Sequence, residues 1–456
     1  MLSVLRPAAT GLVLAAIAAV PADAAITYIG QAAIPNGTDF SGLTGNLEDG
    51  LPGNRLGGFG SGIAYNGTDN TYMLIPDRGP NAVAYPGGAA VDNTISFQSR
   101  VEQFRLSVSP GAGPGGSGGS VNYQFVGTKL LTSGNGAALV GLSSSPNRFD
   151  PEAIRVGKYG TRVYISDEYG PKLNEFDANT GQLLRSFTMP PGFTIANPNP
   201  LGASELPPAN TVGRQANRGA ESLAISPDGT KLFMATQNPL IQDGALNGSN
   251  NRRGVNIRIV QFDIATGQAE KQFVYVLGDG TTAAPNGGRS LGINDMVAIN
   301  GHELLIVERD GNGGASAAVK RIAKVDLTGA TDISNLADPL PQTGLPPGVT
   351  AVSKTTLLDL LDPSFGLAGD AFPEKIEGLA FGPDLADGRH ILFVTSDNDF
   401  LDTPTHVYAF AIGAADINYV AQVFVPEPAS LGLLAVGAAG GVVLRRRRAR
   451  GVRRSA

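Results

Sequence analysis

The sequence contains no cysteine and no tryptophan, only three histidines, and only 16% charged residues. Without cysteine the chain can form no disulfide, use no thiol nucleophile and hold no cysteine-ligated zinc. A Gly-x-Ser-x-Gly elbow is also absent, which argues against an α/β-hydrolase esterase. Long helical periodicity is missing as well, except at the two ends of the chain.

The N-terminal end has the pattern of a secretory signal. Arg6 is the only charged residue before Asp23, and residues 8–20 are apolar throughout. Ala22-Asp23-Ala24 provides the small-x-small pattern that signal peptidase reads. We therefore predict a signal peptide over residues 1–24, with cleavage before Ala25; the alternative is a buried N-terminal helix.

The C-terminal end combines three features in order. Pro426-Glu427-Pro428 is followed by sixteen uncharged, mostly apolar residues, 429–444, and then by an arginine-rich tail, 445–456, with seven arginines. Sixteen residues fall slightly short of the ~20 that cross a bilayer as a helix. Arginines can snorkel, however, and their excess favours the cytoplasmic side. We expect this segment to hold an exported body at the membrane, at least transiently.

The same three features resemble the PEP-CTERM sorting signal. That resemblance implies an exosortase-type enzyme that cuts near the Pro-Glu-Pro triplet and releases the body or re-attaches it at the cell surface. The mature protein would then lie at the outer envelope or outside the cell, without a permanent transmembrane helix.

Charge is divided unequally between the body and the tail. The whole chain carries −6, but the last thirty residues carry seven arginines and one glutamate, so the body carries about −12. Nucleic acid is thereby excluded as a partner, because phosphate binding needs clustered lysine and arginine. An acidic body is compatible with divalent cations.

A strand pair recurs five times along the body. Each copy has a short apolar strand, a turn with Gly, Asp or Asn, and a second apolar strand. The first strands begin at Gly62, Glu152, Glu221, Asp295 and Glu377, and the second at Tyr72, Arg162, Lys231, Glu303 and His390. Several copies add a third strand that ends in an Asp-centred turn, and a fourth strand.

This repetition predicts an all-β fold, a β-propeller of five to six four-stranded blades over residues 25–425. The 61 glycines and 31 prolines suit its connections, and the surplus length falls in loops such as 109–120 and 188–217. We expect residues 26–34 to pair with residues 418–425 and close the ring. A two-sheet sandwich is the alternative, but it does not explain the fivefold recurrence.

Polar residues gather at one end of each predicted blade. Four first strands open on an acid, and the second strands end on polar pairs that lie beside those acids in an antiparallel hairpin. Because first strands line the channel of a propeller, these residues should ring its mouth. The acids are Asp77, Glu152, Asp167, Glu168, Glu221, Asp295, Glu308, Glu377 and Asp397, and the arginines are Arg78 and Arg309.

Carboxylates gathered so closely would raise each other's pKa unless something offsets their repulsion. Ca²⁺, with six to eight oxygen ligands, is the natural candidate. Arg78 and Arg309 suggest an anion such as a phosphoryl group beside the metal. The alternative is structural: the acids pair with these arginines or accept backbone N–H bonds at strand ends.

Several short motifs of the body resemble the family described as having esterase-like activity of phytase. They begin at Asp77 (Asp-Arg-Gly-Pro), Ser166 (Ser-Asp-Glu-Tyr-Gly-Pro), Arg218 (Arg-Gly-Ala-Glu), Glu308 (Glu-Arg-Asp-Gly) and Glu377 (Glu-Gly-Leu-Ala-Phe-Gly). The resemblance runs from about residue 59 to residue 410. It implies calcium-dependent phosphoester hydrolysis, with the recurring Glu and Asp residues as the site.

From the residues and the resemblance together we expect two groups of site residues. The catalytic and substrate-holding group is Glu221, Glu377, Asp167, Arg78 and Arg309, and the Ca²⁺-binding group is Glu152, Glu168, Asp295, Glu308, Asp397 and Asp77. Two other functions stay open: a non-catalytic surface propeller that binds exopolysaccharide or a partner, and a calcium-dependent lactone or ester hydrolase. Whether the protein is an enzyme is not decided at this point.

Overall fold

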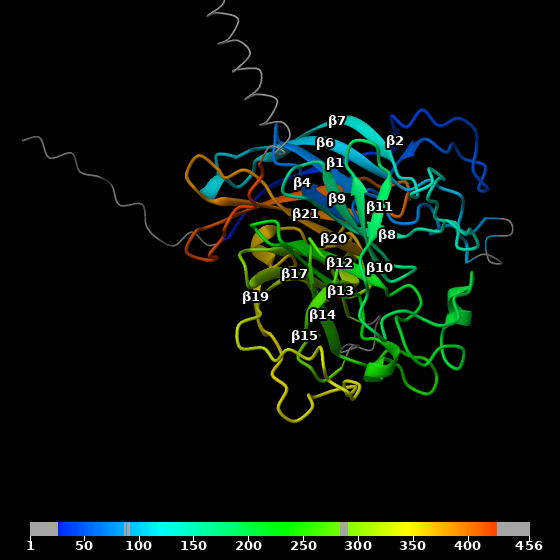
Figure 1. Ribbon diagram of the computed structural model, residues 1–456. Helices are drawn as coiled ribbons and strands as arrows, with labels where there is room; N and C mark the ends of the chain where they lie inside the picture. The colour runs from blue at the N-terminus through cyan, green and yellow to red at the C-terminus, as the bar shows by residue number, and fades with distance from the viewer. Residues whose placement is uncertain (1–25, 86–87, 89–91, 283–290, 426–456) are drawn as a thin grey trace, which may run out of the picture.

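The computed structural model of the protein describes residues 26–85, 88, 92–282 and 291–425. Its regular secondary structure is almost entirely β-strand, arranged as five four-stranded antiparallel sheets and one two-stranded sheet (Figure 1). Five sheets confirm the predicted propeller and set its blade count at five. The predicted signal peptide, residues 1–24, and the tail after residue 425 lie outside the described residues.

Each blade takes four strands. Blade 1 is β4 (Gly62–Tyr65), β5 (Thr71–Ile75), β6 (Arg100–Ser109) and β7 (Ser120–Leu130). Blade 2 is β8 (Pro151–Val156), β9 (Arg162–Asp167), β10 (Lys172–Asp177) and β11 (Leu183–Ser186); blade 3 is β12 (Ala220–Ile225), β13 (Lys231–Thr236), β14 (Asn256–Asp263) and β15 (Ala269–Val276). Blade 4 is β16 (Gly292–Ala298), β17 (Glu303–Arg309), β18 (Lys320–Asp326) and β19 (Ser353–Asp359); blade 5 is β20 (Lys375–Phe381), β21 (His390–Asp397), β22 (Thr405–Ile412) and β1 (Thr27–Ile34).

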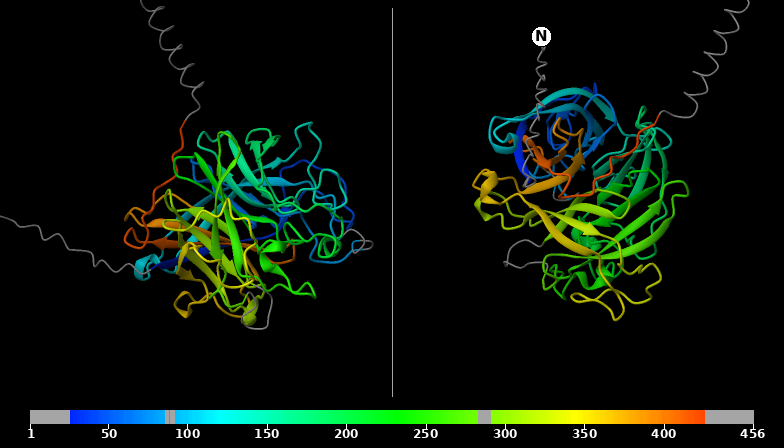
Figure 2. Two further views of the ribbon diagram at one scale, coloured as in Figure 1. Left: turned by 60° about the horizontal axis from the view of Figure 1, so that its bottom comes forward. Right: turned by 90° about the vertical axis from the view of Figure 1, so that its left-hand side faces the viewer.

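The first strand of each repeat lies innermost. The strands β4, β8, β12, β16 and β20 contact one another in that order, and β20 contacts β4, so they form a closed ring around a channel. The views in Figure 2 show the blades arranged around this centre. We call the end where the inner strands begin the mouth, and the end where they turn into the second strands the base.

Packing between blades explains why the central strands are apolar on both faces. Five clusters of buried side chains fill the five spaces between neighbouring blades. In β17 all seven residues are buried, and in β13 all but the first are buried. A short, continuous apolar run of this kind is typical of a strand covered on both sides.

Ring closure differs from the expected pairing. The N-terminal strand β1 does close the last blade, but it pairs antiparallel with β22, from Thr27 with Ala411 to Ile34 with Thr405. Residues 418–425 form no strand in the described chain and instead cross the base. The predicted partner of the first strand was therefore wrong. Residues 418–425 have the apolar alternation of a strand, but no free sheet edge of the described chain lies beside them.

A small sheet of β2 (Gly37–Thr38) and β3 (Arg55–Leu56) lies outside the five blades. The loops expected over 109–120 and 188–217 are confirmed as connections, the first between β6 and β7 and the second between β11 and β12. No helix within the described ranges is both long and apolar enough to cross a membrane.

Candidate functional site

The mouth of the channel opens into a cavity of about 640 Å³. Its wall is made by the starts of the inner strands, the ends of the second strands and the loops that follow them. Among the described residues, seven acids line it, Asp77, Glu152, Glu168, Glu221, Glu374, Glu377 and Asp399, and so do five cations, Arg78, Arg218, Arg252, Arg309 and Lys375. The cavity is therefore less acidic than the sequence predicted, because Arg218, Arg252 and Lys375 were not among the predicted site residues.

Corresponding positions of the inner strands meet at the mouth. The residues Ile63, Ile154, Leu223, Met296 and Leu379 each pair with the equivalent residue of the second strand. The residue two positions before each of them is Ser61, Glu152, Glu221, Asn294 or Glu377. Four of the blades have a register irregularity at this point, which turns these side chains toward the cavity.

Amide groups connect the glutamates of this inner ring. Nδ2 of Asn294 donates hydrogen bonds to Oε1 of Glu221 at 2.7 Å and to Oε1 of Glu377 at 3.4 Å. Nε2 of Gln237 donates to the same oxygen of Glu221 at 2.6 Å. Gln237 stands where other repeats carry a charge at the end of the second strand, and the structure gives its role: it orients Glu221.

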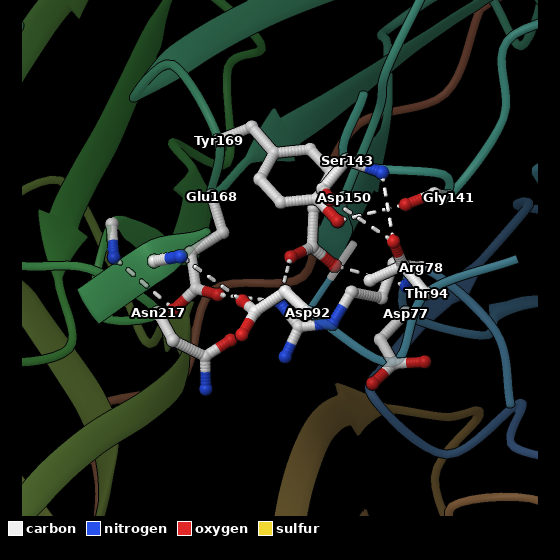
Figure 3. Close-up of polar contacts among 12 residues, drawn as sticks. Asp77, Arg78, Asp92, Thr94, Gly141, Ser143, Asp150, Glu168, Tyr169 and Asn217 are labelled. Atoms are coloured by element: carbon white, nitrogen blue, oxygen red, sulfur yellow. Dashed lines mark hydrogen bonds and ion pairs between the residues drawn. The ribbon is translucent and has the colours of Figure 1, made fainter. Parts of the chain in front are cut away.

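A group of three carboxylates lies in blade 2. Oxygens of Asp150, Glu152 and Glu168 come within 4.8 Å of one another. The guanidinium of Arg78 lies between two of them, 2.8 Å from Asp150 and 3.7 Å from Glu168, with Tyr169 beside it (Figure 3). One cation cannot balance three ionised carboxylates, so the group keeps an excess of about two negative charges.

Burial and mutual repulsion raise the pKa values of two acids in this group. Burial, and then the charge of neighbouring acids, raises the pKa of Glu152 well above its ordinary value. The pKa of Asp150 is also raised well above its ordinary value, chiefly by burial and against the opposing charge of Arg78. The side-chain carboxylate of Glu152 accepts no hydrogen bond from a residue in the described part of the chain, and it borders the cavity. A bound cation would relieve both penalties.

A second acidic group, formed by Asp77, Asp397 and Asp399, has a different balance. Its oxygens also lie within 4.8 Å of one another, but Nζ of Lys375 reaches all three residues, at 3.8 Å from Asp77 and 3.1 Å from Asp397. The charges of Asp397 and Asp399 hold the pKa of Lys375 well above its usual range, despite its burial. The lysine thus takes the place that a metal would take.

Asp295, predicted as a calcium ligand at the mouth, lies inside the channel instead. One of its oxygens is 2.8 Å from the guanidinium of Arg155, and the other accepts the backbone N–H of Leu379 at 3.0 Å. Arg155 also donates to the carbonyl oxygens of Ile63 and Met296. The pair joins blades 1, 2, 4 and 5 in the ring interior. Asn294, one residue earlier, holds the position at the mouth.

Three further predicted residues do not line the mouth. Asp167 accepts the backbone N–H groups of Asp150 and Tyr169, both at 3.1 Å, and stabilises the loop after β9. Glu308 turns away from the channel toward Arg321, Lys354 and the hydroxyl of Tyr275. Asp397 sits behind Lys375. The structural alternative stated from the sequence describes Asp167, which accepts backbone N–H groups, whereas Glu308 and Asp397 pair with cations other than Arg78 and Arg309. Side chains alternate along a strand, so only every second one faces the channel.

The remaining predicted residues do meet at the mouth: Asp77, Arg78, Glu152, Glu168, Glu221, Arg309 and Glu377. Arg309 binds Glu377 at 2.7 Å, and Arg78 binds Asp150 and Glu168, so the charges of both arginines are already balanced.

Two arginines that sequence reasoning passed over have no acidic partner. Neither Arg218 nor Arg252 forms an ion pair with a residue that the structure describes. Within the described ranges, their side chains hydrogen-bond the carbonyl of Asn217 and the amide oxygen of Gln215 alone. Burial lowers the pKa of Arg218, and burial together with the nearby charge of Arg218 lowers the pKa of Arg252 to about 10. Arg218 stands three residues before Glu221, which is a signal in the sequence; Arg252 lies in a loop and has none.

Comparison with known proteins agrees with this architecture. The family described as "Phytase-like: Esterase-like activity of phytase" matches residues 54–400. A PEP-CTERM protein-sorting motif matches residues 424–448, which implies processing by an exosortase-type enzyme. Both matches confirm resemblances read from the sequence.

Individual relatives are distant. An "Uncharacterized secreted protein" of Arthroderma benhamiae is 26% identical over 328 residues, which cover 58% of this chain and 61% of that protein. Among solved structures, a Malassezia sympodialis allergen, Mala s 1, is similar with 10% identity, a TM-score of 0.35 and 84% of each chain covered. Myxococcus xanthus glutaminyl cyclase is similar with 11% identity, a TM-score of 0.33, and 84% of this chain and 97% of that chain covered.

Proposed function

This chain belongs to the family of phytase-like proteins with esterase-like activity, and we propose that it is an exported hydrolase that cleaves phosphoesters with the help of Ca²⁺. The observation that carries the proposal is the meeting of two groups at one cavity. Glu152 and Glu168, two of three clustered carboxylates with excess negative charge, line it together with two arginines that form no ion pair with a described residue. The first group suits a cation, and the second suits an anionic substrate.

Asp150, Glu152 and Glu168 are the residues that would hold the cation. They supply only hard carboxylate oxygens, which Ca²⁺ prefers, and their charge exceeds that of Arg78. The group around Lys375 is less suitable, since Nζ of the lysine already contacts all three aspartates and occupies the place of a cation. The chemistry that bound Ca²⁺ supplies is polarisation of the phosphoryl group and activation of water.

Arg218 and Arg252 would bind the phosphoryl oxygens of the substrate. Both line the cavity, and their guanidinium groups have N–H donors free of acidic partners. Charge-assisted hydrogen bonds from arginine to phosphate are strong and geometrically specific. Arg78 and Arg309, predicted for this role, would contribute mainly by holding Asp150 and Glu377 in place.

Glu221 is the residue we assign as general base. Two amide groups hold its Oε1, so its Oε2 is left to take a proton from a water molecule in the cavity. Burial and the charges of Glu168 and Glu377 raise its pKa well above the ordinary value, so Glu221 is a stronger base than a free carboxylate. Glu377, already bound to Arg309, is less available for proton transfer.

The test is hydrolysis of a generic phosphomonoester and of phytate by the purified protein, with Ca²⁺ or with a chelator. We expect turnover that depends on Ca²⁺, and a loss of about 100-fold in kcat for Glu221→Gln, a typical effect of removing a general base. Arg218→Ala and Arg252→Ala should mainly raise KM, each by about 10-fold, the equivalent of one charge-assisted hydrogen bond.

Glu270→Gln is the matched control, because Glu270 is exposed on blade 3 and paired with Lys231 far from the channel. Absence of turnover on both substrates, with tight Ca²⁺ binding retained, would reject hydrolysis and favour a binding propeller for exopolysaccharide or another partner. Turnover of lactones or carboxylic esters alone would instead favour the ester hydrolase.

A further inference from the structure

The last described segment of the chain, which we call the strap (residues 417–425), runs across the base of the ring. Figure 2 shows this orange-to-red segment passing over the blades before the grey trace begins. Backbone N–H groups of Val420, Val423 and Val425 donate to carbonyl oxygens of Ile299, Pro227 and Lys158, at 2.7, 2.8 and 3.0 Å. These three acceptors follow the inner strands of blades 4, 3 and 2.

Side chains of the strap reach the other two blades. The ring of Tyr419 packs on that of Phe381 of blade 5, with centroids 4.0 Å apart. Phe424 packs against Tyr65 of blade 1 and over Gly67, where a Cβ would lie only 2.4 Å from its ring. The strap also borders a mostly apolar cavity of about 260 Å³ at this end of the channel. It therefore touches all five blades on the face opposite the mouth.

The docked strap leaves little chain before the tail. Val425 is its last bonded residue, the Pro-Glu-Pro triplet follows at once, and the predicted apolar segment begins at residue 429. Four residue steps span at most about 14 Å even when extended. An inner strand of seven residues, such as β20, is itself roughly 20 Å long. The four-residue link between the strap and the apolar segment is therefore too short for the mouth to face the membrane that this segment would enter.

We propose that the base is the face that meets the membrane and the sorting enzyme, and that the mouth points away from it. The strap sets this orientation by fixing the exit point of the tail at the base. A substrate then enters the mouth from the surrounding medium while the tail is still attached. The inference depends on the sorting tail and the strap, and it holds whether or not the mouth is catalytic.

The absence of cysteine makes a direct test available. Single cysteines are introduced in the full chain at Ala82, an exposed residue of the mouth, and at Tyr159, an exposed residue of the β8–β9 turn at the base. Each is labelled with a fluorophore, and the chain is bound to vesicles of phosphatidylcholine and phosphatidylglycerol that contain a nitroxide-labelled lipid. We expect several-fold greater quenching for the label at Tyr159→Cys than at Ala82→Cys.

A variant of the strap tests whether docking of the strap on the base sets the orientation, or whether attachment of the tail alone is enough. Val423→Pro removes the N–H that donates to Pro227, so the difference in quenching should shrink; Ala421→Pro, at a position whose N–H is no donor in the described network, is the control. Equal quenching at both labels, stronger quenching at the mouth, or failure of the full chain to float with the vesicles would each overturn the proposal. The phosphoester assay is independent of all these outcomes.

Discussion

Individual side chains at the mouth show how a few positions separate a structural acid from a functional one. Glu308 and Asp295 are neutralised by basic residues of their own surroundings, whereas Glu152 faces the cavity without a cationic partner of its own. Burial raises the pKa of Asp77 to about 6, and those of Asp150, Glu152 and Glu221 are raised further in the same direction. These acids bind protons more tightly in the folded chain than in the unfolded chain, where their pKa is near 4.

This difference predicts how stability depends on pH. Below about pH 4 the acids are protonated in the folded and in the unfolded chain, so they do not lower the free energy of unfolding. As pH rises toward 6 and above, ionisation is unfavourable in the folded chain only, so the free energy of unfolding falls. In a chelator we therefore expect Tm to fall between about pH 5 and pH 7.5. Added Ca²⁺ should raise Tm more at the higher pH, because it binds the ionised form.

Thermal melting with Ca²⁺ and with chelator across this pH range measures the effect. Glu152→Gln should remove most of the calcium-dependent rise, while Glu270→Gln should leave it unchanged. A rise that is equal at both ends of the range, or that survives in Glu152→Gln, would place calcium elsewhere.

Among the elements, β1 is the strand that completes the last blade of the ring. It supplies the outer strand of blade 5 from the opposite end of the chain and buries Ile29 and Ile34 between that blade and blade 1. Such closure converts an open row of blades into a ring without free edges, so its loss exposes a sheet edge as well as apolar surface.

Ile34→Ala should lower the free energy of unfolding by about 2–4 kcal/mol, the cost of removing buried methyl groups from a packed site. Gln31→Ala, at an exposed position of the same strand, should change it by less than about 0.5 kcal/mol. Urea unfolding followed by tyrosine fluorescence measures both, and a similar loss in the two variants would mean that β1 packing does not support the ring.

At the scale of the whole molecule, the strap and β1 hold the ring at two independent places. The strap contacts all five blades, just as the Arg155–Asp295 pair joins blades 1, 2, 4 and 5 inside the ring, and it borders the cavity at the base. The mouth and Val425, the last described residue, thereby lie on opposite faces.

Tyr419→Ala should lower the free energy of unfolding by about 2 kcal/mol, through lost burial and the lost aromatic pair with Phe381. The neighbouring Val420→Ala, at a residue that is 52% exposed, should cost little. Denaturant unfolding of the two variants is the measurement. Equal stability would show that the strap lies on the base without supporting it, and would weaken the argument for a fixed orientation.

The sequence alone determined the blade repeat and the C-terminal sorting motif, because hairpin periodicity, turn residues and a short motif are local properties of the chain. It also brought Glu152, Glu221 and Glu377 to one end of the ring. Tertiary structure decided what each acid does there. In β16 the position equivalent to these glutamates is Asn294, and Asp295, one residue later, lies against Arg155. Asp77 of blade 1 and Lys375 of blade 5 are far apart in sequence, and only packing brings them together.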